Sequence, residues 1–296
     1  MKYSGISGKT AIVTGAGEGI GYAICELLVQ AGANVVLNDI DEHLANRAAK
    51  ALSQSQASKK ANIKNNANTP EKGNALKNEN SPTKASADDE GNIGSCLSFA
   101  GDAGDVDTIN QMVDFALENF RNIDFIVPNA GITLFGDFLA FTPDSFQKVM
   151  ALNLRGAFFL AQRAAREMID KGSGGRMVLM SSQVGIRAYH RLSAYGMTKA
   201  ALRMLAQNLA YELGQYGITV NAIAPGATLT ERTAKEQPDY EGIWSQLNPN
   251  GRVGKPEDVA KTCLFLLSEE GSHINGQTIP VDGGWTTAGK YPEDLE

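Results

Sequence analysis

Short apolar runs alternate with amphipathic helical patterns along most of this chain. Most of the runs are too continuously apolar to leave one face of a strand in water, which is typical of parallel strands covered by helices on both faces. Seven runs are candidate strands: 11–14, 35–38, 96–99, 125–127, 177–180, 220–223 and 278–281. The pattern therefore predicts an α/β protein built on about seven parallel strands flanked by helices.

The segment between the first two candidate strands has the pattern of a helix packed on a sheet. Apolar side chains recur there at helical spacing and stop before Gly32, at Ile20, Ala23, Ile24, Leu27, Leu28 and Ala31. Strand, helix and strand in this order predict a right-handed βαβ unit and a doubly wound sheet of the Rossmann type.

A polar segment interrupts this pattern at about 53–92. Its forty residues include eight Asn and, as large aliphatic side chains, only Ile63 and Leu76. Such a segment cannot bury enough apolar surface to offset the entropy that is lost on ordering. We therefore expect a single Rossmann-type domain over 1–296, interrupted by a disordered insertion at 53–92 and ending in a short C-terminal tail at 286–296.

Charge and hydropathy exclude several classes of function. The chain of 296 residues carries 27 Lys and Arg against 33 Asp and Glu, a net charge of −6. This acidity argues against nucleic-acid binding, which would need a concentrated basic patch. No apolar run approaches the roughly 20 residues of a membrane span, and the N-terminal sequence lacks the apolar core and cleavage site of a secretory signal. The sequence therefore predicts a cytoplasmic protein with no membrane partner.

The cysteine and histidine residues are scattered and form no metal-ligand pattern. Cys25, Cys96 and Cys263 are an odd number of widely separated residues, and none belongs to a CxxC pair. We therefore expect the cysteines to be small apolar core residues and expect no metal site.

A glycine-rich turn joins the first candidate strand to the first predicted helix. Glycines at such a place allow a tight turn, a close approach of the backbone to a pyrophosphate, and close packing of the helix on the strand. The turn therefore predicts a dinucleotide site. Its residues are Gly15, Gly17, Glu18, Gly19, Ile20 and Gly21.

Asp39 ends the second candidate strand, where a carboxylate can accept hydrogen bonds from an adenosine ribose. A 2′-phosphate would face this carboxylate and that of Glu18, and neither segment contains a Lys or Arg that could neutralise it. We therefore expect NAD to be preferred over NADP.

Ser182, Tyr195 and Lys199 form a second candidate constellation. Ser182 follows a candidate strand, whereas Tyr195 and Lys199 lie four residues apart at the start of a predicted helix and so share one face. Forming a tyrosinate at pH 7 costs roughly 4 kcal/mol for an ordinary phenol. A neighbouring ammonium, together with a positively charged nicotinamide, would lower the pKa of Tyr195 and suit it to acid and base catalysis.

These motifs occur in an order and spacing that closely resemble the short-chain dehydrogenase/reductase family, from about residue 7 to residue 285 apart from the insertion. The resemblance rests on TGxxxGxG at 14–21, Asn-Ala-Gly at 129–131, Asn153, Ser182, Tyr-x-x-x-Lys at 195–199 and Pro-Gly at 225–226. It implies a single-domain NAD(P)-dependent oxidoreductase that interconverts alcohols and carbonyl compounds, often as a homotetramer.

The resemblance also implies a role for each matching position. Tyr195 would be the general acid and base, Ser182 would hold the substrate oxygen, and Asn153 would hold a water in a proton relay. Lys199 would bind the nicotinamide ribose and lower the pKa of Tyr195. The other positions that would line the cofactor are Asp102, Ala103, Asn129, Ala130, Gly131, Pro225, Gly226, Thr228 and Thr230, with Asp102 against the adenine.

Two segments are expected to set the substrate. They are 184–193, which leads to Tyr195, and 228–251, which resembles the substrate lid of the family. In the first segment, Arg187 and His190 are candidate contacts for a hydroxylated or acidic substrate, or else solvent or interface residues. Nothing in the sequence distinguishes a sugar or polyol from a 3-oxoacyl thioester, a steroid or a cyclic ketone.

Two alternatives stay open at the level of sequence. The first is a 3-oxoacyl-[acyl-carrier-protein] reductase of fatty-acid synthesis, although such enzymes generally prefer NADPH and Asp39 argues against that preference. The second is a non-catalytic dinucleotide sensor that recruits a partner through the insertion. A sensor would have no use for the full catalytic set Asn153, Ser182, Tyr195 and Lys199.

Overall fold

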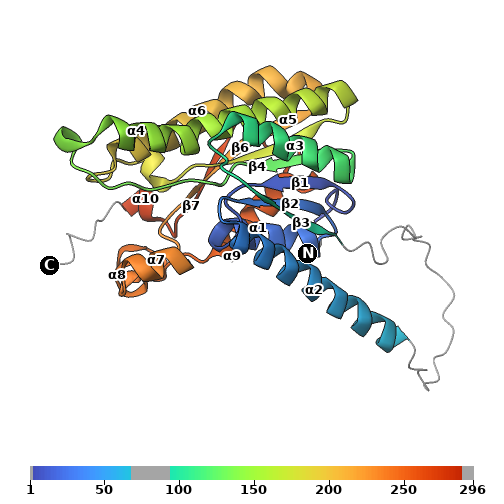
Figure 1. Ribbon diagram of the computed structural model, residues 1–296. Coiled ribbons are helices and arrows are strands. Elements are labelled where there is room, and N and C mark those ends of the chain that lie inside the picture. Colours follow the sequence, from blue (N-terminus) through green and yellow to red (C-terminus); the bar gives the residue numbers. More distant parts are fainter. Residues whose placement is uncertain (1–2, 68–93, 289–296) are drawn as a thin grey trace.

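Seven parallel strands form one sheet in the structure, a computed structural model that describes residues 3–67 and 94–288 (Figure 1). The strands follow one another across the sheet in the order β3-β2-β1-β4-β5-β6-β7. Their bounds are β1 (Thr10–Val13), β2 (Asn34–Asp39), β3 (Cys96–Ala100), β4 (Phe125–Val127), β5 (Gly175–Met180), β6 (Ile218–Pro225) and β7 (Thr278–Val281). The expected doubly wound fold is confirmed, and every expected strand is present with its ends shifted by at most two residues.

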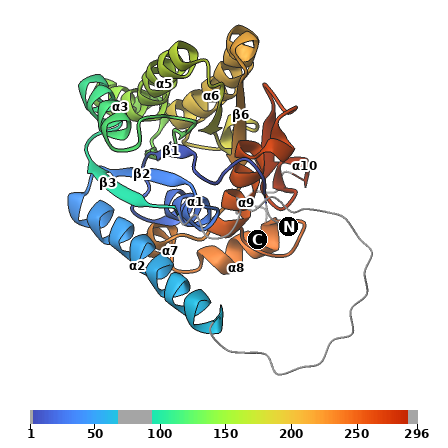
Figure 2. The same cartoon turned by 90° about the vertical axis from the view of Figure 1, so that its right-hand side faces the viewer.

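Helices cover both faces of this sheet (Figure 2). One layer contains α1 (Gly19–Gln30), α2 (Glu42–Ala67) and α9 (Pro256–Leu267), and the opposite layer contains α3 (Val106–Phe120), α5 (Ala157–Lys171) and α6 (Ser193–Leu213). Alternation along β1 divides the core, because Ala11 and Val13 pack in the α1 layer whereas Ile12 packs in the α3 layer. Fully burying a valine or isoleucine side chain contributes roughly 1.5–3 kcal/mol, so these contacts hold both layers on the sheet.

Helix α2 extends into the segment that was expected to be a disordered insertion. It continues to Ala67, so residues 53–67 of the expected insertion are helical in the structure. The first half of α2 is anchored on the sheet by buried side chains at Ala45, Ala48, Ala49 and Leu52. Residues 53–67 contain no Gly or Pro, so a helix nucleated by the anchored half can extend through them at little cost. The rest of the expected insertion lies outside the described residues.

Long connections leave the carboxyl ends of β4, β5 and β6 and form one end of the molecule. Their helical elements are α4 (Pro143–Met150), a π-helical turn (Ala151–Gly156) that leads into α5, a 3₁₀ turn after β5 (Gln183–Gly185), α7 (Glu231–Glu236), α8 (Tyr240–Leu247) and α10 (Trp285–Ala288). Further 3₁₀ turns are Phe138–Ala140, Gly214–Tyr216 and Glu269–Gly271. A small third core around Trp244, Leu247 and Trp285 joins α8 to α10, so α7 and α8 form a lobe beside the sheet (Figure 1).

The three cysteines are free thiols buried in the α1 layer of the core. Burial raises the pKa of Cys96 to about 12, as an apolar environment does for any thiol. In the part of the chain that the structure describes, no cluster of His, Cys, Asp and Glu side chains could hold a metal ion. None of the helices within 3–67 and 94–288 has the length and hydropathy of a bilayer span.

Candidate active site

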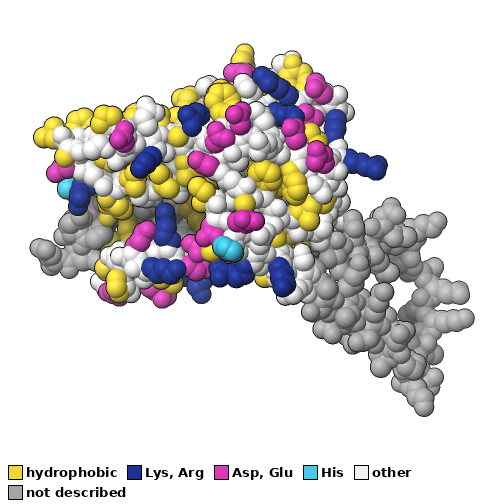
Figure 3. Space-filling model, in the orientation of Figure 1, with side chains coloured by type: hydrophobic (Ala, Val, Ile, Leu, Met, Phe, Trp, Pro, Cys, Tyr) yellow, Lys and Arg dark blue, Asp and Glu magenta, His cyan; other side chains and the backbone are white. Residues whose placement is uncertain are grey.

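A cavity of about 820 Å³ opens at the carboxyl ends of the strands, beside β1 and β4. The order of the strands reverses here, and parallel α/β sheets bind their ligands at such a point. The start of α1, the loops after β4 and β5, the start of α6 and the α7–α8 lobe all contribute lining residues. Figure 3 shows a hollow between the layer of α4–α6 and this lobe.

The glycine-rich turn lies at one end of the cavity. Gly15 has a φ of +60°, and a Cβ there would lie 2.7 Å from the Cα of Ala130, so only glycine fits at this close approach. A Cβ on Gly21 would lie 2.4 Å from the carbonyl oxygen of Gly15, so this glycine lets α1 pack against the turn. Of the predicted residues of the turn, the cavity is lined by Gly15, Glu18, Gly19 and Ile20, whereas Gly17 and Gly21 lie behind its surface.

The first turn of α1 has the donors that an anionic ligand needs. Glu18, the N-cap residue, makes no side-chain hydrogen bond to the helix, so the side chain leaves the first backbone N–H groups of α1 uncapped. Uncapped N–H groups at the positive end of a helix dipole favour phosphate oxygens. The residues at this end of the cavity therefore fit the pyrophosphate of a dinucleotide.

Asp39 supports the same turn from the end of β2. Its Oδ2 accepts a hydrogen bond from the Gly17 N–H at 3.0 Å, and its Oδ1 accepts one from the Asp41 N–H at 3.1 Å. The carboxylate is thus oriented by two backbone donors while it lines the cavity. Asp102 and Ala103, from the loop after β3, line the same end.

Asn129 connects the glycine-rich turn to the loop after β4. Its Nδ2 donates to the carbonyl oxygens of Thr14 and Gly15, at 3.0 and 2.8 Å. In return, the Thr14 hydroxyl accepts the N–H groups of Asn129 and Ala130, both at 3.1 Å. These bonds hold together two loops that are far apart in sequence. Asn129, Ala130 and Gly131 all line the cavity.

Tyr195 lies at the other end of the cavity, in the first turn of α6, where Ser182 and Thr133 form hydrogen bonds with its phenol. Burial is the largest influence and raises the pKa of Tyr195 above its usual value, although these two bonds favour the phenolate. Burial thus outweighs these two hydrogen bonds and the charge of Arg232, and a lowering of this pKa by Lys199 and a bound nicotinamide stays a prediction. The Ser182 hydroxyl also accepts the Val184 N–H at 3.2 Å, which fixes its position.

Lys199 lies one helical turn after Tyr195, and its Nζ is 5.5 Å from the centre of the Tyr195 ring. The same Nζ donates to the carbonyl oxygen of Met180, at the end of β5, at 2.8 Å. Burial, and in second place the charge of Arg232, lower the pKa of Lys199 to about 8. A Cβ on Gly131 would lie 3.4 Å from this Nζ, so glycine keeps space open beside the ammonium.

Asn153 lies in the π-helical turn between α4 and α5, behind the wall of the cavity. Its Oδ1 accepts the Ile132 N–H at 2.8 Å, and its Nδ2 donates to the Ile132 carbonyl oxygen at 2.9 Å and to the Thr198 hydroxyl at 3.3 Å. π-helical turns often occur at functional sites. Here the turn places Asn153 so that it holds the loop that carries Thr133, and its role in a proton relay stays a prediction.

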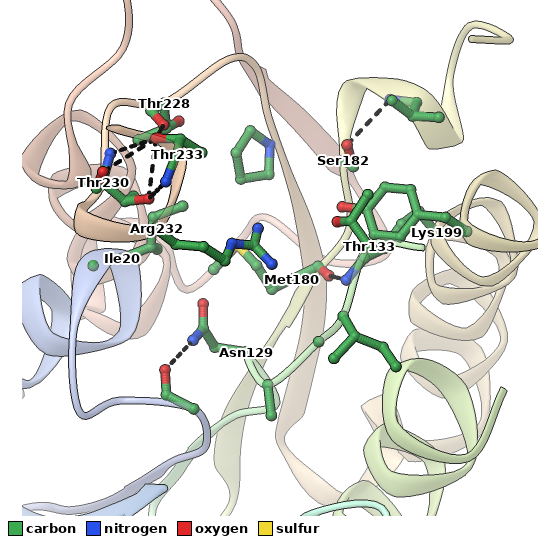
Figure 4. Close-up of a pocket in the computed structure, with 18 of the residues that line it drawn as sticks. Ile20, Asn129, Thr133, Met180, Ser182, Lys199, Thr228, Thr230, Arg232 and Thr233 are labelled. Atoms are coloured by element: carbon green, nitrogen blue, oxygen red, sulfur yellow. Dashed lines mark hydrogen bonds between the residues drawn. The ribbon is translucent and has the colours of Figure 1, made fainter. Parts of the chain in front are cut away.

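The loop after β6 and helix α7 border the cavity on the side that faces the glycine-rich turn (Figure 4). The Thr230 hydroxyl accepts the Thr233 N–H at 3.2 Å and the Thr233 hydroxyl accepts the Thr230 N–H at 2.8 Å, so a capping box starts α7. A Cβ on Gly19 would lie 3.4 Å from Cγ2 of Thr230, so α7 begins directly opposite that turn. The predicted residues Pro225, Gly226, Thr228 and Thr230 all line the cavity.

Arg187 and His190, the two candidate substrate contacts, do not line the cavity. Arg187 donates to the carbonyl oxygen of Thr286 at 3.1 Å, and its guanidinium lies 5.9 Å from the centre of the Trp285 ring. His190 is exposed. From the same loop, Tyr189 lines the cavity instead, because the path of this irregular segment depends on its packing against α8 and α10 rather than on a local pattern.

The substrate end of the cavity contains several residues that the sequence did not single out. Most are aromatic or aliphatic, and one is a cation: Thr133, Phe135, Tyr189, Leu192, Arg232, Tyr240 and Trp244. Tyr189 and Leu192 belong to segment 184–193 and the last three to segment 228–251, the two segments that were expected to set the substrate. For Arg232 the available signal was its position two residues after Thr230, whereas no local pattern marks Phe135 or Tyr189.

Two family models match the chain and together cover most of it. The model described as short chain dehydrogenase matches residues 9–75, and the model described as enoyl-(acyl carrier protein) reductase matches residues 77–286.

Known proteins are similar to nearly the whole chain. Versicolorin reductase of Emericella nidulans is 35% identical over 294 residues, which cover 94% of this chain and 96% of that protein. L-rhamnose-1-dehydrogenase of Scheffersomyces stipitis is 34% identical over 282 residues, with 94% and 96% covered. The crystal structure of a short-chain type dehydrogenase/reductase from Mycobacterium marinum superposes with a TM-score of 0.78 at 28% identity, covering 95% of this chain and 96% of that one.

Proposed function

The chain belongs to the short-chain dehydrogenase/reductase family, and we propose that it transfers a hydride between NAD(H) and a secondary alcohol or ketone, with Tyr195 as the general acid and base. Members of this family are NAD(P)-dependent oxidoreductases, and the named relatives are a reductase and a dehydrogenase. One observation carries the proposal. The Tyr195 phenol, hydrogen-bonded by Ser182 and Thr133, shares one cavity with a turn that fits a dinucleotide.

The proton chemistry of the reaction belongs to Tyr195. During reduction its phenol donates a proton to the carbonyl oxygen as negative charge develops there, and during oxidation the phenolate accepts the proton of the alcohol. The Ser182 hydroxyl donates a second hydrogen bond to the same oxygen and orients it. A bound nicotinamide supplies or takes up the hydride that the substrate carbon gains or loses.

Positive charge near the phenol helps Tyr195 to release its proton. Burial keeps the pKa of Tyr195 high in the free protein, and the charge of Arg232 opposes this effect. The Lys199 ammonium beside the ring also attracts a phenolate, and its pKa of about 8 leaves most of it charged at pH 7. The Met180 carbonyl holds this ammonium in place.

We propose NAD rather than NADP as the preferred cofactor. The uncapped N–H groups of α1 would bind the pyrophosphate, and Asp39 would accept hydrogen bonds from the adenosine ribose. A 2′-phosphate would meet the carboxylates of Asp39 and Glu18, which also line this end of the cavity. The other residues proposed to contact the cofactor are Asp102, Ala103, Asn129, Ala130, Gly131, Lys199, Pro225, Gly226, Thr228 and Thr230.

Neither alternative function is favoured. The curated relatives named above are a versicolorin reductase and an L-rhamnose dehydrogenase, not 3-oxoacyl reductases of fatty-acid synthesis. These relatives are enzymes, which disfavours a non-catalytic sensor. Action in the cytoplasm stays a prediction from the sequence.

We also propose that the enzyme is a homotetramer. An apolar groove between α4, α5 and α6 supports this, since it is lined by side chains such as Phe158 and Met204, which are 42% and 55% exposed. Apolar patches of this kind often mark protein interfaces. Light scattering on the purified protein should give four times the mass of the chain, and Phe158→Glu should reduce it.

Replacement of the phenol tests the mechanism. Tyr195→Phe should lower kcat about 100-fold or more on any ketone or alcohol that the wild type turns over, because positioned acid catalysis is lost. Tyr211→Phe is the matched control, since Tyr211 is on the same helix and 92% exposed. The assay is nicotinamide absorbance across a panel of sugars, polyols, cyclic ketones and 3-oxoacyl thioesters. Wild-type turnover by Tyr195→Phe would show that the mechanism is wrong.

A further inference from the structure

Arg232 is a charged residue of the cavity, and the proposed mechanism assigns no ligand to it. It lies in the first turn of α7, and its side chain extends from that helix into the cavity toward Met180 (Figure 4). Among the described lining residues, Lys199 is the other cation, and its Nζ is already bonded to the Met180 carbonyl oxygen. The guanidinium of Arg232, by contrast, has only a long ion pair with Glu236 among the described residues.

The charge of Arg232 acts on the groups around the reacting position. Burial has the largest influence on the pKa values of Tyr195, Tyr240 and Lys199, and the charge of Arg232 acts to lower all three. Such effects weaken rapidly where water lies between the charges. The guanidinium thus acts on the catalytic phenol across a cavity that both side chains line, while its own side chain is 48% exposed.

Arg232 has only a weak partner in the free protein. Its Nε lies 3.9 Å from a carboxylate oxygen of Glu236, one turn further along α7, and the two side chains are 48% and 61% exposed. An ion pair at this distance and exposure is screened by water and contributes little. Within the described residues the guanidinium makes no hydrogen bond. Its N–H donors are available to a ligand.

Aromatic side chains line the cavity together with Arg232. Tyr189 and Tyr240 lie against Trp244, with ring centres 6.5 and 6.0 Å from that of the tryptophan. Phe135 extends the series, with its ring centre 6.5 Å from that of Tyr189. All four rings line the cavity. Such a wall accommodates the apolar body of a ligand, whereas a guanidinium binds an anionic group.

We propose that Arg232 binds an anionic group of the substrate, so that the enzyme prefers alcohols or ketones that carry a carboxylate on an apolar or aromatic body. The planar fork of a guanidinium matches the two oxygens of a carboxylate. The phosphates of a dinucleotide have separate donors in the first turn of α1, so they do not require this side chain. The inference rests on the proposed function, because it assigns the substrate class of that same site.

Paired probes test this assignment. The acid 4-acetylbenzoate and the amide 4-acetylbenzamide are ketones of similar shape that differ in charge. We expect the wild type to have the higher kcat/KM for the acid, and Arg232→Gln to lower the acid-to-amide ratio about tenfold, the effect of one charge-assisted contact. Arg232→Lys should restore part of the ratio. Lys235→Gln, which removes an exposed charge from the same helix, should leave the ratio unchanged.

Calorimetry on the NADH-bound protein provides a readout that does not depend on turnover. The wild type should bind the acid more tightly than the amide, and Arg232→Gln should abolish this difference. Equal binding of the two probes by the wild type would overturn the proposal. An Arg232→Gln variant that keeps the acid preference would also overturn it. A variant that loses affinity for NADH and ADP-ribose, but binds acid and amide as the wild type does, would overturn it as well. In that case Arg232 would bind the cofactor phosphates.

The outcomes also separate this inference from the proposed function. Turnover that depends on Tyr195 but shows no acid preference would overturn the role of Arg232 alone. Acid-selective binding that depends on Arg232, without any turnover that depends on Tyr195, would support the anion site and contradict the proposed mechanism.

Discussion

The ammonium of Lys199 lies 5.5 Å from the centre of the Tyr195 ring, and burial moves the pKa values of the two groups in opposite directions. Burial disfavours the charged form of each group, so the pKa of Tyr195 rises above 10 and that of Lys199 falls to about 8. In the free protein Lys199 therefore loses its proton at a lower pH than Tyr195 does. The chain by itself does not produce the phenolate at neutral pH.

Replacing Lys199 should remove a pH-dependent part of the stability. The folded pKa of about 8 lies below the ordinary value of 10.5, so between these values the unfolded chain binds the extra proton and the free energy of unfolding rises with pH. The Lys199→Met variant lacks this rise in the free energy of unfolding, because methionine does not titrate. Urea denaturation at pH 7 and pH 9 should show that the stability of the wild type relative to Lys199→Met increases by about 1 kcal/mol.

A matched control for this experiment is Lys148→Met, which removes an exposed lysine from α4. Its stability relative to the wild type should change little between the two pH values. A Lys199→Met variant that behaves in the same way would contradict the lowered pKa of Lys199.

Removing the carboxylate at the end of β2 should change cofactor choice. Asp39→Asn should raise the ratio of kcat/KM for NADP to that for NAD by about tenfold, since a like-charge contact with a 2′-phosphate is lost. Asp41→Asn is the control, because Asp41 is close in sequence but does not line the cavity. Its Oδ1 instead caps α2 by accepting the Leu44 N–H at 3.0 Å. Steady-state kinetics with both cofactors measures the ratio. An unchanged ratio in Asp39→Asn would mean that this carboxylate does not contact the ribose.

Loss of the Asn153 amide should affect both stability and catalysis. Asn153→Leu leaves the N–H and carbonyl groups of Ile132 without their partners in a partly buried setting, which costs about 2 kcal/mol. The loop that carries Thr133 then loses its support, so kcat should fall more than the affinity for NADH. Thermal unfolding, kcat and NADH binding measured on the same sample check this. An active variant of normal stability would show that Asn153 does not hold this loop.

A methyl group at Gly21 should disturb the glycine-rich turn of the dinucleotide site, although Gly21 itself does not line the cavity. Its Cβ would lie 2.4 Å from the Gly15 carbonyl oxygen and 2.7 Å from Nδ2 of Asn129, so Gly21→Ala should cost about 1–3 kcal/mol and weaken NADH binding. Gly214→Ala is the control, since the nearest atom to its Cβ would be 3.7 Å away. Fluorescence titration with NADH compares the two variants, and equal affinities would contradict the proposed role of the turn.

Short-range patterns explain why much of the fold and site could be predicted. Most strands of the sheet contain a continuous apolar run, and the spacing of Tyr195 and Lys199 places both on one helical face in any helix. The glycine-rich turn likewise follows from residues that are neighbours in sequence. In these cases local geometry alone constrains the arrangement, so a single sequence suffices to predict it.

Other features depended on contacts that no local pattern reveals. Residues 53–67 are helical because the start of α2 is anchored on the sheet, although their composition alone predicts disorder. Arg187 packs against Trp285 while Tyr189 lines the cavity, since the path of an irregular loop depends on distant partners.

The sequence by itself determined the doubly wound sheet and the place of the dinucleotide turn, because both follow from periodicity and spacing along the chain. It identified the candidate catalytic residues through the resemblance of its motifs to a known family. The tertiary structure alone decided how deeply Tyr195 and Lys199 are buried, and so the direction in which their pKa values move. It also brought Arg232 of α7 into the cavity beside them. Burial and charge proximity arise from segments far apart in sequence, and only folding establishes them.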